Sequence, residues 1–137
     1  MTMILLDTTV LIDLTKNNKT VLQKLRELEN EHTFYTTQVN VYEVLYGIYA
    51  AKFDSGTYDK RLNTYMDLFS SIKILDMTLQ GTSEAARIGG TLCKEGRMIE
   101  DTDCLTAGIA LAHGVTRILT RNAEHFSRIK GLTIITY

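Results

Sequence analysis

Short apolar runs alternate with longer stretches of helical periodicity along the chain, and no linker, repeat or low-complexity tract separates them. The short runs predict strands that are covered on both faces: Met3 to Leu6, Thr33 to Tyr35, Ile72 to Leu75, Arg117 to Leu119 and Leu132 to Ile135. The longer stretches predict helices: Val21 to Glu29, Val39 to Lys52, Tyr58 to Phe69, Leu79 to Lys94 and Cys104 to His113. Strands that alternate with helices indicate an α/β fold with a central parallel sheet and helices on both faces.

Composition and charge limit the classes of protein to which the chain can belong. With 137 residues, 45% hydrophobic and 23% charged, the chain is predicted to fold as a single domain over residues 1–137. It shows neither a secretory signal nor an apolar run of the ~20 residues that span a bilayer, so we expect a cytoplasmic protein with no membrane partner. A net charge of −1 excludes a broad basic surface for nucleic acid, so any such contact must be local.

Isolated acids inside otherwise uncharged segments are the most informative feature. Leaving His113 aside, three segments each hold one charged side chain: Asp7 between Met1 and Ile12, Glu43 between Thr33 and Ala51, and Asp103 between Thr102 and Thr116. A carboxylate in such surroundings is expected to lose part of its hydration, which is costly unless a cation or hydrogen-bond donors compensate. The three acids are therefore candidates for one functional site.

Glu43 makes this argument sharper because it falls inside a predicted helix. At spacings of three, four and seven residues it shares a face with mostly apolar or small residues: Val39, Tyr46, Gly47 and Ala50. We expect this face to be packed inward. No lysine or arginine occurs in that helix before Lys52, so a pair within the helix does not neutralise the acid.

The predicted topology brings the acids to one edge of the sheet. Ligands of an open parallel sheet bind beyond the carboxyl ends of its strands, and Asp7 stands at such an end. Asp103 begins the helix that leads into the fourth strand, where the helix dipole favours a negative charge. Asn122 follows that fourth strand and should face the same crevice. Converging oxygen ligands are typical of Mg²⁺ or Mn²⁺ sites.

Each residue also has a structural interpretation. Asp7 could cap the turn after its strand, and Glu43 could be a buried acid bonded to a backbone amide. Asp101 is more readily interpreted as the N-cap of the helix that contains Asp103 than as a ligand. Arg121 could be a solvated charge or a contact to a phosphate, and the sequence does not choose between the two.

The remaining reactive or aromatic side chains are assigned to structure. Cys93 and Cys104 lack the spacing of a zinc or redox site and are predicted to be small core residues. His125 is placed at the edge of a short helix and His32 in a loop, with no chemical role. Three tyrosines at helical spacing are predicted to pack in the core or against a second copy of the chain: Tyr42, Tyr46 and Tyr49.

Four blocks, in this order, carry a resemblance that covers essentially the whole chain. They are LLDTTVLID at 5–13, VYEVLYGI at 41–48, IEDTDCLTAG at 99–108 and ILTRNAEHF at 118–126, and IKGLTIITY follows at 129–137. Together they resemble the PIN-domain ribonucleases, specifically the VapC-type toxins. The resemblance implies a three-layer α/β/α fold, Mg²⁺-dependent cleavage of RNA with Mn²⁺ as a possible substitute, a cognate VapB-type antitoxin whose tail fills the active-site groove, and homodimers.

By position, Asp7, Glu43 and Asp103 match the core acids of that family. A fourth position that is often aspartate in the wider group is Asn122 here. This difference leaves open whether Asn122 completes the site, orients a water, or is replaced in part by Asp101.

The chemistry expected of these residues is hydrolysis of a phosphodiester bond in transfer RNA or messenger RNA. Asp7 and Asp103 are predicted to bind the metal directly, and Glu43 to hold it through water or to accept a proton from the nucleophile. Asn122 and the hydroxyl side chains near the site are predicted to be auxiliary residues that orient bound water: Thr8, Thr9 and Thr120.

Two other hypotheses remain. A receiver-type signalling domain also carries acids at strand ends, and Asp76 follows the third strand, but no lysine follows Ile135 as that mechanism requires. A catalytically silent PIN-like binding module is the second, and the acids at positions 7, 43 and 103 argue against it. Cleavage of RNA with and without Mg²⁺ separates these possibilities.

Overall fold

A computed structural model describes residues 2–137 of the chain. Strands and helices follow one another in this order: β1 (Thr2–Leu6), α1 (Thr8–Thr15), α2 (Lys19–Leu28), β2 (His32–Thr37), α3 (Gln38–Ala50), α4 (Ser55–Ser71), β3 (Lys73–Leu75), α5 (Leu79–Lys94), α6 (Asp101–Ala112), β4 (Arg117–Leu119), α7 (Ala123–Phe126) and β5 (Thr133–Ile135). No helix in this described part is long and apolar enough to cross a membrane.

Short polar side chains fix where the helices begin. In each of five helices the N-cap side chain accepts a hydrogen bond from a backbone N–H of the first turn, as Asp, Asn and Thr commonly do: Asp7, Asn18, Thr37, Asp54 and Thr78. Helix α1 was not among the predicted helices. Asp7, Thr8 and Thr9 at its start resemble a turn, and the apolar part that follows is too short to show a helical period.

The strands form one parallel sheet in the order β3-β2-β1-β4-β5 within the described residues. The chain proceeds outward from β1 through β2 to β3, and then returns to place β4 on the other side of β1. The direction of winding therefore reverses between β1 and β4. In open parallel sheets, ligands bind beside the carboxyl ends of strands at such a reversal.

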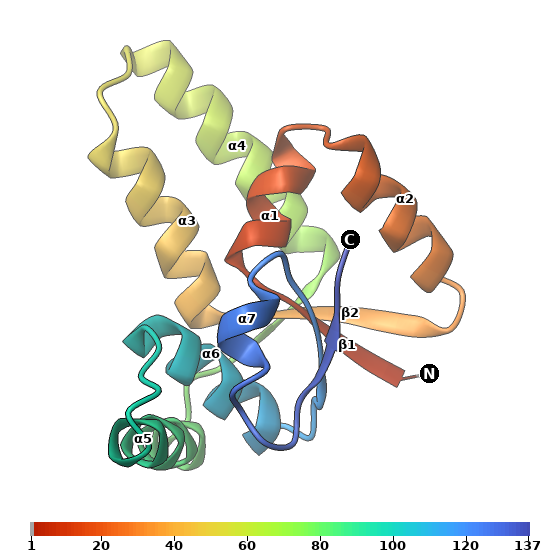
Figure 1. The fold of residues 1–137 in the computed structure, drawn as a ribbon. Helices are drawn as coiled ribbons and strands as arrows, with labels where there is room; N and C mark the ends of the chain where they lie inside the picture. Colours follow the sequence, from red (N-terminus) through yellow and green to blue (C-terminus); the bar gives the residue numbers. More distant parts are fainter. Residues whose placement is uncertain (1) are drawn as a thin grey trace.

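Alternate residues of β1 enter two separate cores, as the two-residue period of a strand requires. Ile4 and Leu6 belong to a core built with α1–α4, whereas Leu5 belongs to a core built with α5 and α6. Figure 1 shows α5 and α6 on the opposite side of the sheet from α1–α4. The predicted three-layer α/β/α architecture with a five-stranded parallel sheet is confirmed.

Helix α6 packs unusually closely against α5, and a glycine makes this possible. A Cβ atom on Gly108 would lie 2.4 Å from the backbone nitrogen of Ala85 and 2.6 Å from its Cα. Real Cβ atoms do not approach other atoms so closely, so any larger residue would force the helices apart. The contact therefore sets the distance between α5 and α6, the helix that carries Asp103.

One prediction about packing was wrong, and another loses one of its two alternatives. Cys104 is buried as expected, but Cys93 is exposed on α5. The tyrosines of α3 are not in the core: Tyr42, Tyr46 and Tyr49 are 62%, 61% and 64% exposed. Helix α3 buries a different face, and whether a second copy covers these tyrosines stays a prediction.

Candidate active site

Asp7 lies at the carboxyl end of β1 and is only 4% exposed. Its Oδ2 accepts a hydrogen bond from the hydroxyl of Thr120 (2.5 Å), and its Oδ1 accepts from the hydroxyl of Thr9 (2.6 Å) and the backbone N–H of Val10 (3.3 Å). Burial raises the pKa of Asp7, and these hydrogen bonds oppose the rise. Asp7 is thus the N-cap of α1 and, at the same time, a desolvated carboxylate with neutral partners.

Asp103 lies in the first turn of α6, as predicted. Its Oδ2 is 2.9 Å from Nδ1 of His125 and accepts a hydrogen bond from Nδ2 of Asn122 (3.3 Å). Burial is the main reason why the pKa of Asp103 is raised, while the contact with His125 acts in the opposite direction. Asn122, which follows β4, thus lies beside Asp103, as the sequence predicted.

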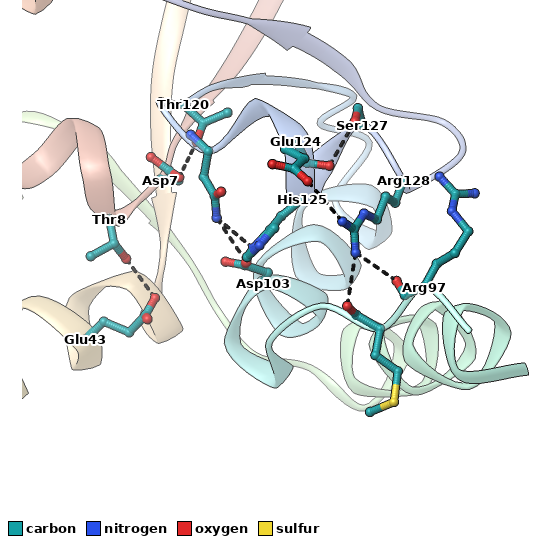
Figure 2. A network of polar contacts seen from close by, with 12 residues as sticks. Asp7, Thr8, Glu43, Arg97, Asp103, Thr120, Glu124, His125, Ser127 and Arg128 are labelled. Atoms are coloured by element: carbon teal, nitrogen blue, oxygen red, sulfur yellow. Dashed lines mark hydrogen bonds and ion pairs between the residues drawn. The ribbon is translucent and has the colours of Figure 1, made fainter. Parts of the chain in front are cut away.

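His125 had been given no chemical role, yet it contacts Asp103 directly. It lies on the short helix α7, and its Nδ1 is also 2.9 Å from Nδ2 of Asn122. The sequence did contain a signal, because Asn122 and His125 are three residues apart and side chains at that spacing share one face of a helical turn. Figure 2 shows His125 extending toward Asp103.

Glu43 approaches the site from α3 and is tied to α1. Its Oε1 accepts a hydrogen bond from the hydroxyl of Thr8 (2.7 Å). Nδ2 of the buried Asn40 in turn donates to Thr8 (3.0 Å) and to the hydroxyl of Thr106 on α6 (3.3 Å). One hydrogen-bond network therefore joins α1, α3 and α6 beneath the acids. The partner of Glu43 is a hydroxyl and not the backbone amide considered above.

The predicted environment of Glu43 needs one correction. Most of its own helical face is not packed inward: Val39 is buried as expected, but Tyr46, Gly47 and Ala50 are exposed and Glu43 itself is partly buried. The face of α3 that enters the core is the one with Val44 and Ile48. Apolar and small residues on the Glu43 face were therefore a misleading sign of burial. They lie instead next to the acid at the surface.

Asp7 and Asp103 influence each other electrostatically, since the charge of Asp103 contributes to the raised pKa of Asp7. Figure 2 shows Glu43 entering the same region from the opposite side to Asp103. No group of three His, Cys, Asp or Glu side chains within residues 2–137 is placed to hold a metal ion. Asp7 and Asp103 nevertheless suit Mg²⁺, which usually keeps several waters and is bound by one or two carboxylates. Asp7 has only neutral hydrogen-bond partners, so no protein cation competes with a metal ion there.

Two other candidates lie at the edge of this region. Asp101 is the first residue of α6 and is exposed; the N-cap is Glu100, so its predicted capping role is wrong. Arg121 follows Thr120 in the loop after β4. Its Nε is 2.8 Å from Oδ2 of Asp13, and half of its side chain remains exposed.

A groove of about 470 Å³ begins beside Glu43 and runs between α1, α3 and α4. Apolar side chains from two helices and their connection line part of it, including Ile48, Phe53 and Tyr65, while Lys16 and Arg61 also lie along it. The groove thus combines an apolar lining with positive charge and shares one acid with the candidate site.

The fold and the site define an α/β/α protein with one buried and two partly buried acids near the winding reversal of a parallel sheet. The model of the PIN domain family matches residues 4–132, and the chain belongs to this family. Membership rules out the receiver-type interpretation.

Known proteins of similar sequence or structure agree with this. A Shigella flexneri protein named tRNA(fMet)-specific endonuclease VapC is 26% identical over 128 residues, which cover 93% of this chain and 92% of that protein. Two solved structures share the fold with a TM-score of 0.83 each. VapBC2 from Rickettsia felis, bound to a DNA fragment from its promoter, is 21% identical and covers 98% of both chains. DNA-bound VapBC from Salmonella typhimurium is 23% identical over 99% of this chain and 98% of that one.

Proposed function

We propose that the protein is a metal-dependent endoribonuclease and the toxin of a VapBC-type toxin-antitoxin pair. The observation that carries the proposal is the pair of desolvated carboxylates, Asp7 and Asp103, at the reversal between β1 and β4. Membership in the PIN domain family and the similarity to a tRNA-cleaving VapC support it. An RNA substrate would place the protein in the cytoplasm.

Asp7 and Asp103 would hold a divalent cation, Mg²⁺ or Mn²⁺, since both carboxylates are short of hydration and one repels the other. Such an ion would supply a Lewis acid for the phosphate and an activated water. Thr120 and Thr9 fix both oxygens of Asp7 through their hydroxyls, and Asn122 holds one oxygen of Asp103. These neighbours keep the ligand oxygens in place, which is the usual task of groups around a metal site.

Glu43 would act through water rather than as a third direct ligand. Thr8 holds its Oε1, so that the carboxylate is oriented from α1. Partly buried and facing the region of the other two acids, Glu43 is suited to orient the attacking water and accept its proton. No serine, cysteine or histidine nucleophile is required.

Binding of RNA would be local, because the chain has a net charge of −1. Arg121, between Thr120 and Asn122, is half exposed next to the acids and is proposed to contact a phosphate of the RNA. Recognition would then depend on the shape of a single-stranded loop, in transfer RNA or messenger RNA.

The groove beside Glu43 is proposed to receive a segment of the VapB-type antitoxin. Its apolar lining suits an amphipathic segment, and Lys16 and Arg61 suit acidic residues on it. Gly47 lines the groove with open space around it, so Gly47→Phe should fill the groove. The variant is expected to cleave RNA while resisting inhibition by the purified product of a neighbouring antitoxin reading frame; undiminished inhibition would contradict this placement. Homodimer formation stays a prediction that analytical ultracentrifugation can check.

The proposed activity is tested by cleavage of end-labelled transfer RNA and messenger RNA by the purified protein, with the enzyme in about tenfold excess over RNA so that a single turnover is measured. Cleavage is expected with added Mg²⁺ or Mn²⁺ and is expected to stop in EDTA. Asp7→Asn and Asp103→Asn should abolish it, whereas Asp67→Asn, which alters an exposed acid on α4, should not. Folded wild-type protein that cleaves no RNA under any of these conditions would instead support the silent PIN-like module.

A further inference from the structure

Asp13 is a buried carboxylate for which the proposed chemistry has no use. It lies on α1 and is only 6% exposed. Its Oδ2 accepts a hydrogen bond from the phenol of Tyr137 (2.7 Å) and pairs with Nε of Arg121 (2.8 Å). A buried charge is costly unless it is paired and hydrogen-bonded. Both partners come from parts of the chain more than 100 residues away, so the carboxylate joins three distant segments.

The position of Arg121 gives this cluster its significance. Thr120, immediately before it, donates its hydroxyl hydrogen bond to Asp7 (2.5 Å). Asn122, immediately after it, donates from Nδ2 to Asp103 (3.3 Å). A shift of Arg121 would therefore displace the donors of both carboxylates at once.

A second tie joins the same loop to α1. The backbone N–H of Arg121 donates to the hydroxyl of Thr9 (3.1 Å), and that hydroxyl donates to Oδ1 of Asp7 (2.6 Å). Helix α1 thus holds the loop after β4 through one backbone contact and one side-chain ion pair. Tyr137 adds the segment that follows β5, the edge strand paired with β4.

Tyr137 is suited to a permanent donor role. Burial, together with its hydrogen bond to Asp13, raises the pKa of the phenol to about 12. The hydroxyl therefore keeps its proton at the pH values at which enzymes are assayed. Its hydrogen bond and the Arg121 ion pair both end on Oδ2 of Asp13, so each supports the orientation that the other requires.

We propose that Asp13, Arg121 and Tyr137 form a latch that holds the loop of Thr120 to Asn122 against α1, and thereby sets the geometry in which Asp7 and Asp103 bind a divalent cation. Asp13 is then a positioning residue of the site. The inference rests on the proposed function to the extent that a cation binds between these two acids. It differs from a role of Arg121 in holding RNA phosphate, which would leave metal binding unchanged.

The test is a calorimetric titration of the folded protein, residues 1–137, with Mn²⁺ alone. Asp13→Asn keeps the size of the side chain but removes the charge, and its dissociation constant for Mn²⁺ is expected to rise about 10–100-fold. Tyr137→Phe removes one of the two partners and should give a smaller rise. Tyr58→Phe is the matched control, because Tyr58 donates a phenol hydrogen bond to the carbonyl of Ala51, away from the loop. It should bind Mn²⁺ as the wild type does.

Thermal unfolding of each variant separates positioning from general destabilisation. A merely structural role predicts that Tyr137→Phe and Tyr58→Phe lose stability while both keep the wild-type affinity for Mn²⁺, and this result would overturn the latch. Wild-type affinity in folded Asp13→Asn, or no binding of Mn²⁺ by the wild type, would also overturn it. If Asp13→Asn does not fold, Tyr137→Phe decides. The wild type could also bind Mn²⁺ but cleave no RNA. If Asp13→Asn and Tyr137→Phe then bind Mn²⁺ more weakly than the wild type, the latch is upheld and the nuclease function is rejected.

Discussion

Nδ1 of His125 lies 2.9 Å from Oδ2 of Asp103, although 22 residues separate the two along the chain. Helix α7 thereby supports an acid that α6 presents to the candidate site. Asn122 contacts the same carboxylate oxygen. A carboxylate with two such neighbours has little freedom to turn away, which is what a metal ligand requires.

Removal of the His125 imidazole should therefore weaken metal binding and cleavage and leave the fold intact. His125→Ala is expected to lower both the cleavage rate and the affinity for Mn²⁺ about 10–100-fold. His32→Ala, which removes an imidazole bonded to Thr2 at the other end of β1, should change neither quantity. Rates measured under single-turnover conditions and calorimetric titration check this, and equal effects in the two variants would contradict a local role of His125.

Thr120 offers a test of the support under Asp7. Thr120→Val keeps the shape of a fully buried side chain but removes its hydrogen bond to Oδ2 of Asp7 and the acceptor of the backbone N–H of Asn122 (2.8 Å). Loss of each bond costs about 1 kcal/mol of unfolding free energy, and the cleavage rate should fall about 10–100-fold. Thr120→Ser should restore most of the rate.

Thr36→Val is the matched control for this change. Thr36 is equally buried, but its hydroxyl donates to the backbone carbonyl of Leu6. Urea unfolding should show a loss of stability of about 1 kcal/mol for this one bond, without the loss of rate. A Thr120→Val enzyme that works at the wild-type rate would remove Thr120 from the site.

Much of the fold could be predicted from the sequence because its strands and longer helices have clear periods. The strands were located to within a few residues, and alternation with helices gave the parallel sheet. Helix α1 escaped because it is only eight residues long, and Asp7, Thr8 and Thr9 at its start resemble a turn after the strand. The burial of Glu43 was overestimated because the small and aromatic residues that share its helical face are mostly exposed.

The supporting contacts of the site were harder to foresee than its acids. Asp7, Glu43 and Asp103 stood out because each is the only charge in its segment. His125 lies among other polar residues in the sequence and Asp13 among apolar ones, and only the fold shows that they face Asp103 and Arg121. Contacts between residues more than 20 positions apart carry no local pattern.

The stability of Asp7→Asn tests whether burial of the charged Asp7 carboxylate destabilises the folded state. Burial raises its pKa above the ordinary value of 3.8, so the folded state binds a proton at Asp7 more tightly than the unfolded chain does. The favourable contribution of the protonated acid is complete below about pH 4 and is lost as the pH rises through the raised pKa. At pH 8 in EDTA, the midpoint of urea unfolding should therefore lie at a higher urea concentration for Asp7→Asn than for the wild type.

The advantage of Asp7→Asn should shrink as the pH is lowered toward 4, by about 1.4 kcal/mol for each unit by which the pKa is raised. Added Mn²⁺ should reverse the order at pH 8, since it stabilises only a protein that binds it. Urea unfolding monitored by circular dichroism measures both effects. A variant less stable than the wild type at pH 8 in EDTA would show that Asp7 serves mainly as a favourable cap.

The contact between α5 and α6 can be tested at Gly108. Gly108→Ala would force a Cβ atom into the backbone of Ala85, and overpacking of this kind costs about 1–3 kcal/mol. Gly90→Ala is the matched control, because Gly90 is exposed on α5 with nothing within 4 Å of an added Cβ. Alanine there should raise stability by about 0.5–1 kcal/mol. Equal effects of the two changes in urea unfolding would contradict the close packing.

The central claim is that Asp7 and Asp103 share a divalent ion, with Glu43 acting through water. Crystals soaked in Mn²⁺ test it most directly, because the anomalous signal of manganese locates the ion independently of the protein atoms. The account predicts a peak within about 2.0–2.6 Å of a carboxylate oxygen of both Asp7 and Asp103, and no such peak in Asp103→Asn. Manganese bound elsewhere, or in contact with only one of the two acids, would contradict it.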